Sequence, residues 1–430
     1  MQTTREPWFR RRGYLHFDRP VGQAAALTIV SDPVRVAQRS FFPFLDFDIL
    51  STKVKWDDDL KQLVRKRKER KVAYASHIDS HIYSYYCQLL SARYEQELTR
   101  RGLGDCVLAF RSLGKSNIHF AAEGFAEVSR RSNCFVLGLD IRGFFDTLDH
   151  KILKSAWMSV LGVAQLSPDH YAVYKAITRF SMVNLDSVLE LLGISKNNPR
   201  KGRNRLCTPE DFRDKVRPSG MIRANSTGKG IPQGSSISAL LSNIYMLEFD
   251  CFINEYVAGL GGKYFRYCDD MLFVLPLAAK PTCEAVIKGA ISKCKLEIQD
   301  AKTERRDFVT RGGRLVTDKP LQYLGFLFDG ERIYLRSASL ARYSDRLTRG
   351  VHLAKATMRK RNRARVARGE DPRPLFTGNL MRRYTYFGRR NFISYGYRAA
   401  KIMNSQSIKK QLRPLWGKFQ LALKEERRKR

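Results

Sequence analysis

The chain has 430 residues, 43% of them hydrophobic, which is enough to bury a core shared by two or three subdomains. Its 78 Lys and Arg against 42 Asp and Glu give a net charge of +36. A protein this basic repels itself unless a polyanion covers part of its surface, so we expect nucleic acid as its main partner. An anionic membrane surface is the alternative. No basic amphipathic stripe supports it, however, and no apolar run is long enough to span a bilayer.

The cysteines and the first residues indicate the compartment. Eight cysteines are scattered along the chain without a Cys-x-x-Cys pair, which is typical of a reduced intracellular protein that lacks structural zinc. The N-terminal residues contain no apolar stretch like that of a signal peptide. We therefore expect the protein in the cytoplasm.

The first third of the chain predicts an arm followed by a helical subdomain. Residues 1–54 are a mixed arm of unassigned role. Residues 56–71 begin with carboxylates and end with cations, a polarity that matches the helix dipole and predicts a charged helix. Apolar residues at helical spacing predict further helices over residues 76–101 and from about 117 to 130. We group residues 55–134 as one subdomain.

A buried strand opens the central part of the chain. Residues 134–140 form a nearly continuous apolar run that ends on Asp140, as expected for the middle of a sheet. Asp149 then begins a helix. The segment from about 151 to 229 is helical at first and later polar and rich in Gly and Arg, which predicts an insertion.

A helix and a hairpin follow the insertion. Residues 237–257 predict a helix with an apolar face, and residues 263–276 predict a strand, a tight turn and a second strand. We group residues 135–330 as one subdomain that contains the insertion.

The last hundred residues are the most basic part of the chain. Residues 331–430 contain 28 Lys or Arg and 6 Asp or Glu, a net charge of +22. Aromatic residues interleave these charges, so we expect a helical subdomain that packs on one side and binds phosphates on the other. For the last six residues a solvated tail is the alternative. The nucleic-acid-binding candidates in the densest run are Arg359, Lys360, Arg361, Arg363 and Arg365.

Asp269 and Asp270 lie next to each other at the tip of the predicted hairpin. Two carboxylates this close repel, and their apolar flanks favour burial, so a cation must compensate them. With Asp140 they provide the ligands for two divalent ions about 4 Å apart, the arrangement that transfers a phosphoryl group from a nucleoside triphosphate. We expect two Mg²⁺ ions, with Mn²⁺ as a possible substitute. An ordinary Asp-Asp surface turn is the alternative.

Several segments occur in the order and spacing of the palm motifs of reverse transcriptases. They are residues 135–150, 230–243, 267–270, 296–303 and 322–326. Between about 105 and 330 the chain resembles reverse transcriptases of the group II intron and bacterial type. The resemblance implies an α+β right-hand polymerase and an RNA-directed DNA polymerase activity. Residues 55–134 would form the fingers and residues 135–330 a palm of antiparallel sheet and packed helices, with a finger insertion at 151–229. Residues 331–430 would form a basic helical thumb and tail.

The resemblance also implies roles for single residues. Asp140 and Asp269 would bind the metal ions, with Asp270 assisting them. Lys302 would protonate the leaving pyrophosphate, although a lone surface lysine is the alternative. Phe145 occupies the position of a sugar gate, where a bulky ring under the ribose excludes a 2′-hydroxyl and so favours dNTPs. A core residue is the alternative for Phe145.

Other implied roles concern the incoming nucleotide. Gln233 and Gly234 would belong to a loop that contacts the template and the dNTP, with the glycine permitting close approach of the backbone. Arg111 aligns with the finger strand that clamps the triphosphate, and Lys115 is a second candidate. The more upstream finger motif departs from the family pattern, so a further triphosphate-binding cation at residues 70–71 stays unassigned.

The layout points to a free-standing enzyme. Group II intron enzymes usually continue into a Cys/His nuclease domain, and this chain has no cysteine after Cys294. Retron enzymes are generally shorter. The chain is similar to free-standing bacterial reverse transcriptases of antiphage defence, and to type 2 among them. The resemblance implies a structured non-coding RNA template, dNTPs and a DNA product. The alternatives are an RNA-dependent RNA polymerase, a template-independent polymerase and a non-catalytic RNA-binding scaffold. The sequence does not determine the oligomeric state.

Overall fold

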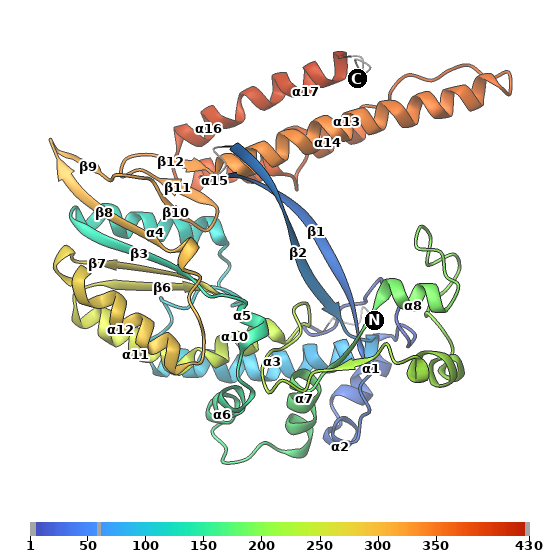
Figure 1. Cartoon of the computed structure of the whole chain (residues 1–430), viewed down its shortest axis with the longest axis horizontal. Coiled ribbons are helices and arrows are strands. Elements are labelled where there is room, and N and C mark those ends of the chain that lie inside the picture. Colours follow the sequence, from blue (N-terminus) through green and yellow to red (C-terminus); the bar gives the residue numbers. More distant parts are fainter. Residues whose placement is uncertain (1–5, 58–61, 426–430) are drawn as a thin grey trace.

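A computed structural model describes residues 6–57 and 62–425. Figure 1 shows a central sheet with helices on both sides, a long two-stranded ribbon and a layer of C-terminal helices above them. Antiparallel sheets and helices combine in an α+β fold, which confirms the predicted fold class. No helix in the described part of the chain is long and apolar enough to cross a membrane.

The palm sheet has the strand order β6-β7-β3-β8-β9, and every neighbouring pair is antiparallel. Its strands are β3 (Cys134–Asp140), β6 (Lys263–Tyr267), β7 (Asp270–Leu275), β8 (Glu304–Arg311) and β9 (Arg314–Val316). Side chains alternate across β3. Phe135, Leu137 and Leu139 pack with α10 (Ser238–Tyr245), α11 (Leu247–Gly259) and α12 (Lys280–Lys293), whereas Val136 packs with α4 (Asn117–Arg131). Burial on both faces explains why the sequence of β3 is apolar throughout.

The fingers contain a long hairpin, and the charged helix predicted for residues 56–71 is wrong. Strands β1 (Phe44–Asp57) and β2 (Gln62–Tyr74) pair in one antiparallel ladder from Leu45↔Tyr74 to Asp57↔Gln62. The polarity of charge along residues 56–71 resembles that of a helix, but the ladder with β1 provides the backbone partners instead. The expected boundary between residues 54 and 55 falls inside β1.

Most of the remaining elements of the lower half pack around the base of the β1–β2 hairpin, whereas residues 277–279 and 300–302 contact β3 of the palm sheet. Strand β1 also pairs in parallel with β4, and β4 pairs with β5. The helices and strands of this half are α1 (Gln23–Val30), α2 (Pro33–Ala37), α3 (His77–Arg100), α5 (Phe144–Thr147), α6 (His150–Leu161), α7 (Pro168–Thr178), β4 (Ser181–Asn184), α8 (Leu185–Leu191), α9 (Pro209–Asp211), η1 (Phe212–Val216), η2 (Arg217–Ser219), β5 (Arg223–Ala224), η3 (Leu277–Ala279) and η4 (Asp300–Lys302). The predicted insertion therefore contains short elements, and its Phe212 and Val216 are buried in a small core that it shares with Phe17 of the N-terminal arm and Leu45 of β1.

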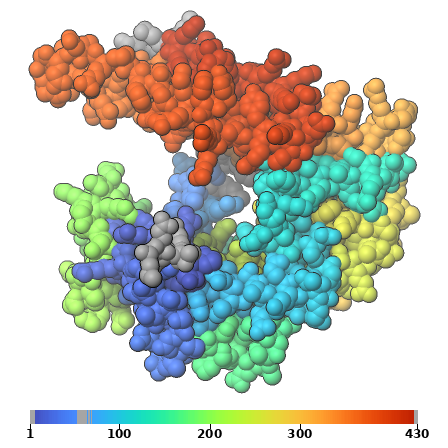
Figure 2. Space-filling model, turned by 180° about the vertical axis from the view of Figure 1, so that it is seen from behind, coloured from blue at the N-terminus to red at the C-terminus, as the bar shows by residue number. Residues whose placement is uncertain are grey.

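The thumb is helical, as predicted. A small sheet of β10 (Leu321–Tyr323), β11 (Phe326–Phe328) and β12 (Ile333–Leu335) precedes it across the predicted boundary at residue 330. The thumb helices are α13 (Ser337–Val366), α14 (Gly378–Tyr384), α15 (Phe392–Ile402), α16 (Gln406–Leu412) and α17 (Pro414–Lys424). The buried Lys355 joins α13 to α17, because its Nζ donates to the carbonyl of Ala422 at 3.0 Å. The far half of α13 extends away from the palm sheet, and Figure 2 shows a hollow between the thumb and the lower half.

Candidate active site

The three predicted acids meet at one end of the palm sheet. In the β3–β7 ladder, Asp140 is the Cα partner of Asp270. Asp269 precedes Asp270 in the two-residue turn between β6 and β7, and the first residue of that turn, Cys268, has a φ of 61°. Side chains far apart in sequence therefore come together because β3 and β7 are adjacent and in this register.

The electrostatics of this cluster favour a bound cation. Burial, followed by the charges of Asp269 and Asp140, raises the pKa of Asp270 to about 7. Burial and the Asp140 charge also raise the pKa of Asp269. The Nζ of Lys302 forms an ion pair with Asp140. Like charges held this close destabilise one another, and a cation of any kind relieves them.

The three acids are of the chemical type that binds magnesium, but their side chains are not placed as a metal site in this structure. Carboxylate oxygens are the ligands that Mg²⁺ prefers. In the described part of the chain, no three Asp, Glu, His or Cys side chains are placed to hold a metal ion together. At Asp140 the ammonium group of Lys302 provides the positive charge that a metal ion would provide.

A buried polar network supports the turn between β6 and β7. The sequence analysis did not predict this network. Arg266 and Asp250 are both fully buried and form a bidentate pair, with Nε to Oδ1 at 2.7 Å and Nη2 to Oδ2 at 2.5 Å. Arg266 Nη1 donates to Asn243 Oδ1 at 2.9 Å and to the carbonyl of Cys268 at 3.2 Å. Tyr264 completes the network by donating to Asp250. An arginine inside an apolar strand was the signal that could have revealed it.

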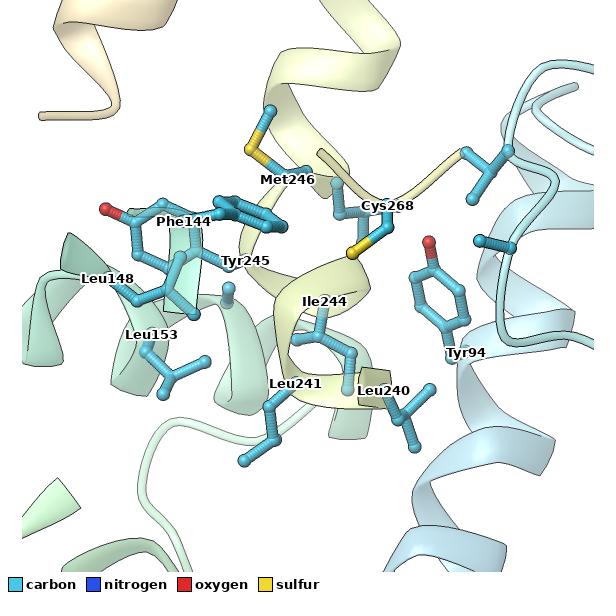
Figure 3. Packing of buried hydrophobic residues seen from close by; sticks show 14 of the residues in the cluster. Tyr94, Phe144, Leu148, Leu153, Leu240, Leu241, Ile244, Tyr245, Met246 and Cys268 are labelled. Carbon is cyan, nitrogen blue, oxygen red and sulfur yellow. The ribbon is translucent and has the colours of Figure 1, made fainter. Parts of the chain in front are cut away.

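Apolar packing holds the same turn from another side. In Figure 3 the Cys268 side chain lies among hydrophobic residues, with Ile244 of α10 and Tyr94 of α3 on either side of it. Burial raises the pKa of the Cys268 thiol, so this cysteine stays protonated and acts as a small apolar residue.

The loop formed by Pro232, Gln233 and Gly234, which we call the Pro-Gln-Gly loop, contacts the fingers. Ala73 at the end of β2 donates its N–H to the carbonyl of Gln233 at 2.9 Å. Gly234 has a φ of 119°, and a Cβ added there would lie 2.4 Å from the carbonyl oxygen of Ala73. The close backbone approach expected at Gly234 is therefore explained by β2, and a nucleotide is not needed to account for it. Ile231 donates to the carbonyl of Phe145 at 2.8 Å, which links the loop to the predicted gate.

The gate position is half-buried, and the residue after it lies near a cation that the sequence left unassigned. Phe145 lies on α5, directly after the strand that carries Asp140, with its ring 5.8 Å from that of Phe144. Burial raises the pKa of the next residue, Asp146, and the charge of Lys71 opposes that shift. Lys71 Nζ is also 3.9 Å from the buried carboxylate of Asp46. Lys71 is thus a finger cation that lies near Asp146, the residue after the predicted gate.

The two predicted triphosphate cations of the finger strand are engaged elsewhere. Arg111 forms a bidentate pair with Glu95 on α3, and its Nη1 donates at 2.6 Å to the carbonyls of Gly104 and Val107. Its side chain is only 6% exposed. Lys115 pairs with Glu123 at 2.6 Å. A triphosphate contact by Arg111 would require breaking its pair with Glu95, so that assignment stays a prediction.

The predicted phosphate-binding run lies on the far half of α13. Its members Arg359, Lys360, Arg361 and Arg363 are exposed, whereas Arg365 is half-buried and lies 3.9 Å from Glu370. This half of α13 extends away from the palm sheet in Figure 1. Within the terminal six residues, only Glu425 lies inside the described part of the chain.

A family model matches part of the chain. The family model described as reverse transcriptase (RNA-dependent DNA polymerase) matches residues 169–328, a span that includes Gln233, Asp269, Asp270 and Lys302. No curated protein matches the chain. Among solved structures, a C-terminally truncated apo telomerase from Candida tropicalis is 12% identical with a TM-score of 0.40. That match covers 68% of this chain and 57% of the telomerase chain.

A second telomerase, from Candida albicans in complex with a TWJ fragment of telomeric RNA, is 10% identical with a TM-score of 0.39. The match covers 91% of this chain and 64% of the telomerase chain. The protein thus spans less than two thirds of the length of these telomerase chains. The family match identifies within it a reverse transcriptase domain, the domain of an RNA-directed DNA polymerase.

Proposed function

We propose that the protein is a reverse transcriptase that copies a dedicated structured non-coding RNA into DNA, in antiphage defence and in the cytoplasm. The register that sets Asp140 opposite Asp270, with Asp269 in the adjoining turn, is the observation that carries the catalytic part. The net charge of +22 over residues 331–430 supports a polyanionic template. The defence role rests on the resemblance of the layout to free-standing bacterial enzymes.

The acids and Lys302 would perform the chemistry. Asp140, Asp269 and Asp270 would hold two Mg²⁺ ions, for which Mn²⁺ could substitute. When bound, such ions lower the pKa of the primer 3′-hydroxyl and offset the negative charge of the triphosphate. Lys302 lies at Asp140 in the free protein, close enough to the acids to give a proton to the leaving pyrophosphate.

Other residues around the acids would select and orient the dNTP. Phe145 would lie under the sugar and exclude a 2′-hydroxyl. Gln233 would contact the base pair, and Lys71 would bind the triphosphate from the finger side. Lys71 suits this role because it is 48% exposed and its carboxylate neighbour, Asp46, is 3.9 Å away. That distance is too long for a direct hydrogen bond, so the ammonium group keeps donors for phosphate.

Primer extension tests the catalytic proposal. Purified protein is given an RNA template, a DNA primer, Mg²⁺ and labelled dNTPs or rNTPs, and we expect template-dependent incorporation of dNTPs. Asp269→Asn with Asp270→Asn should abolish synthesis, whereas Asp186→Asn, an exposed acid on α8, should retain it. Equal use of rNTPs would indicate an RNA polymerase. Synthesis without template would indicate a terminal transferase, and no incorporation at all would indicate a scaffold.

The template and the biological role need a separate experiment. We expect sequencing of RNA that co-purifies with the protein to recover one structured species, together with DNA complementary to it. Expression with that RNA should restrict phage growth, and the Asp269→Asn, Asp270→Asn variant should not. A heterogeneous mixture of cellular RNA would contradict a dedicated template.

A further inference from the structure

The thumb contains a groove that the catalytic proposal does not use. It lies between α13 and the segment that returns beside it, residues 373–384, and we call it the thumb groove. At its far end, Asn362 Nδ2 donates to the carbonyl of Arg373 at 2.8 Å, and Arg373 N donates to Asn362 Oδ1 at 3.0 Å. At its near end, Tyr343 donates to the carbonyl of Tyr384 at 2.6 Å. The cavity between them measures about 840 Å³, a size typical of ligand sites.

Large apolar side chains are left exposed in the thumb groove. Leu353 is 69% exposed and Phe376 is 71% exposed, and both line the cavity. The Phe376 ring rests against the first turn of α14, because its Cζ would lie 3.1 Å from a Cβ added at Gly378. One side of an aromatic ring is therefore supported by the protein while most of its surface faces solvent. Such a ring offers a flat apolar face to a ligand that enters the cavity.

The charge around the groove selects an anionic ligand. The arginines that line it are Arg361, Arg365, Arg373 and Arg383, and no lining residue among those described is acidic. Of these, Arg365 lies 3.9 Å from Glu370, whereas Arg361, Arg373 and Arg383 form no ion pair with the described residues. The surface continues this bias, because residues 346–390 contain 14 Lys or Arg and 2 Asp or Glu. A long polyanion fits this surface better than an isolated small anion.

We propose that the thumb groove binds an unpaired nucleotide of a structured RNA, with its base stacked on Phe376 and its phosphates held by Arg361 and Arg373. A duplex hides its bases and presents phosphates on a convex surface, so it would leave the apolar floor exposed. An unpaired base in a loop or bulge offers a π-face to an aromatic ring. The proposal depends on the proposed function only in identifying this RNA as the template.

The location of the groove gives this contact a purpose distinct from catalysis. The far half of α13 extends away from the palm sheet in Figure 1, and Figure 2 shows a hollow between this part of the thumb and the lower half. A loop held there would anchor the folded part of an RNA while another part of the same molecule reaches the acids of the palm. The groove would thus select one RNA over others of equal charge.

Fluorescence anisotropy with two labelled RNAs tests the proposal. One RNA is a hairpin with an unpaired loop, and the other is a fully paired duplex with the same number of phosphates. Phe376→Ala should weaken binding of the hairpin about 5- to 150-fold, as expected for one lost base stack. It should change binding of the duplex less than twofold. The matched control is Phe252→Ala, which removes an exposed aromatic ring from the palm helix α11.

Charge variants test the phosphate contacts independently. Arg361→Gln with Arg373→Gln should reduce the salt dependence of hairpin binding by about 1.4 in the log–log slope, or about 0.7 for each phosphate contact. Lys151→Gln with Lys293→Gln, two exposed lysines outside the thumb, is the control of equal charge and should leave the slope unchanged. Circular dichroism confirms that each variant is folded. Equal losses for hairpin and duplex with Phe376→Ala, or no loss, would overturn the proposal.

The same experiments separate this proposal from the proposed function. Primer extension on a short unstructured template should be unchanged in Phe376→Ala, because the groove does not reach the acids. If wild-type protein incorporates no dNTP but still prefers the hairpin through Phe376, the proposed function fails and the groove assignment stands. If dNTPs are incorporated and Phe376 is irrelevant to hairpin binding, the groove assignment alone fails.

Discussion

Replacing Asp250 by alanine should destabilise the protein far more than replacing an exposed acid. The change removes the only carboxylate among the described residues that pairs with the fully buried Arg266, and it also removes the acceptor of the Tyr264 hydroxyl. A buried charge left without its partner costs about 3–5 kcal/mol. Whole domains have unfolding free energies of about 5–15 kcal/mol, so this single change uses up a large fraction of the total.

Urea unfolding followed by circular dichroism measures the effect. Asp250→Ala should lower the unfolding free energy by about 3–5 kcal/mol, whereas Asp345→Ala, which breaks an exposed pair with Arg349 on α13, should lower it by at most about 1 kcal/mol. A loss below about 1 kcal/mol for Asp250→Ala would refute the reasoning, because it would mean that Arg266 finds water or another partner.

A double variant separates stability from positioning. Asp250→Leu with Arg266→Met replaces the buried pair by apolar side chains, and such replacements are often neutral or stabilising. We expect the double variant to regain most of the unfolding free energy that Asp250→Ala loses. Incorporation of dNTPs should nevertheless stay low, because the guanidinium no longer donates to the carbonyl of Cys268 beside the acids. Full recovery of activity with stability would show that the network only stabilises the fold.

Three further changes test the roles proposed for Phe145, Gly234 and Lys302. Phe145→Ala should raise the use of rNTPs relative to dNTPs in single-nucleotide extension, and an unchanged ratio would leave Phe145 as a packing residue. Gly234→Ala should cost about 1–3 kcal/mol in urea unfolding and slow incorporation, because its φ is 119° and its Cβ would meet a carbonyl. Gly289→Ala, where nothing lies within 4 Å, should be neutral or stabilising, and equal losses for both variants would contradict this account. Lys302→Met should lower the maximal rate about 10²–10⁴-fold with little change in KM for dNTP, and a rate within twofold of wild type would exclude proton donation by Lys302.

The strands of the palm could be predicted because their signals are local. Residues 134–140 form a strand with the predicted bounds, since burial on both faces demands an apolar residue at nearly every position. The hairpin at 263–276 was likewise visible from its tight turn. The helix expected over 237–257 is instead α10 and α11, which meet at Met246. No glycine or proline interrupts that run, so the sequence carries no sign of the break.

What the sequence did not reveal depends on contacts between distant segments. Residues 56–71 have a helix-like charge polarity, and only the pairing of β2 with β1 decides for a strand. Arg111 matches a motif, yet Glu95 on a separate helix engages its side chain. The pair of Arg266 with Asp250 spans 16 positions and two kinds of element, so neither helical nor strand periodicity could indicate it.

The contacts of the Pro-Gln-Gly loop join the fingers to the palm, so under the proposed function the two would bind the dNTP as one unit. The loop accepts a hydrogen bond from Ala73 of β2 and donates one to the carbonyl of Phe145. The cation Lys71 precedes Ala73 by two residues on the same strand. A shift of the ribbon therefore moves Lys71 and the loop together, and with them the predicted gate. Because Gly234 leaves no space for a side chain against Ala73, direct backbone contact sets the spacing between the proposed triphosphate cation, Lys71, and the predicted gate.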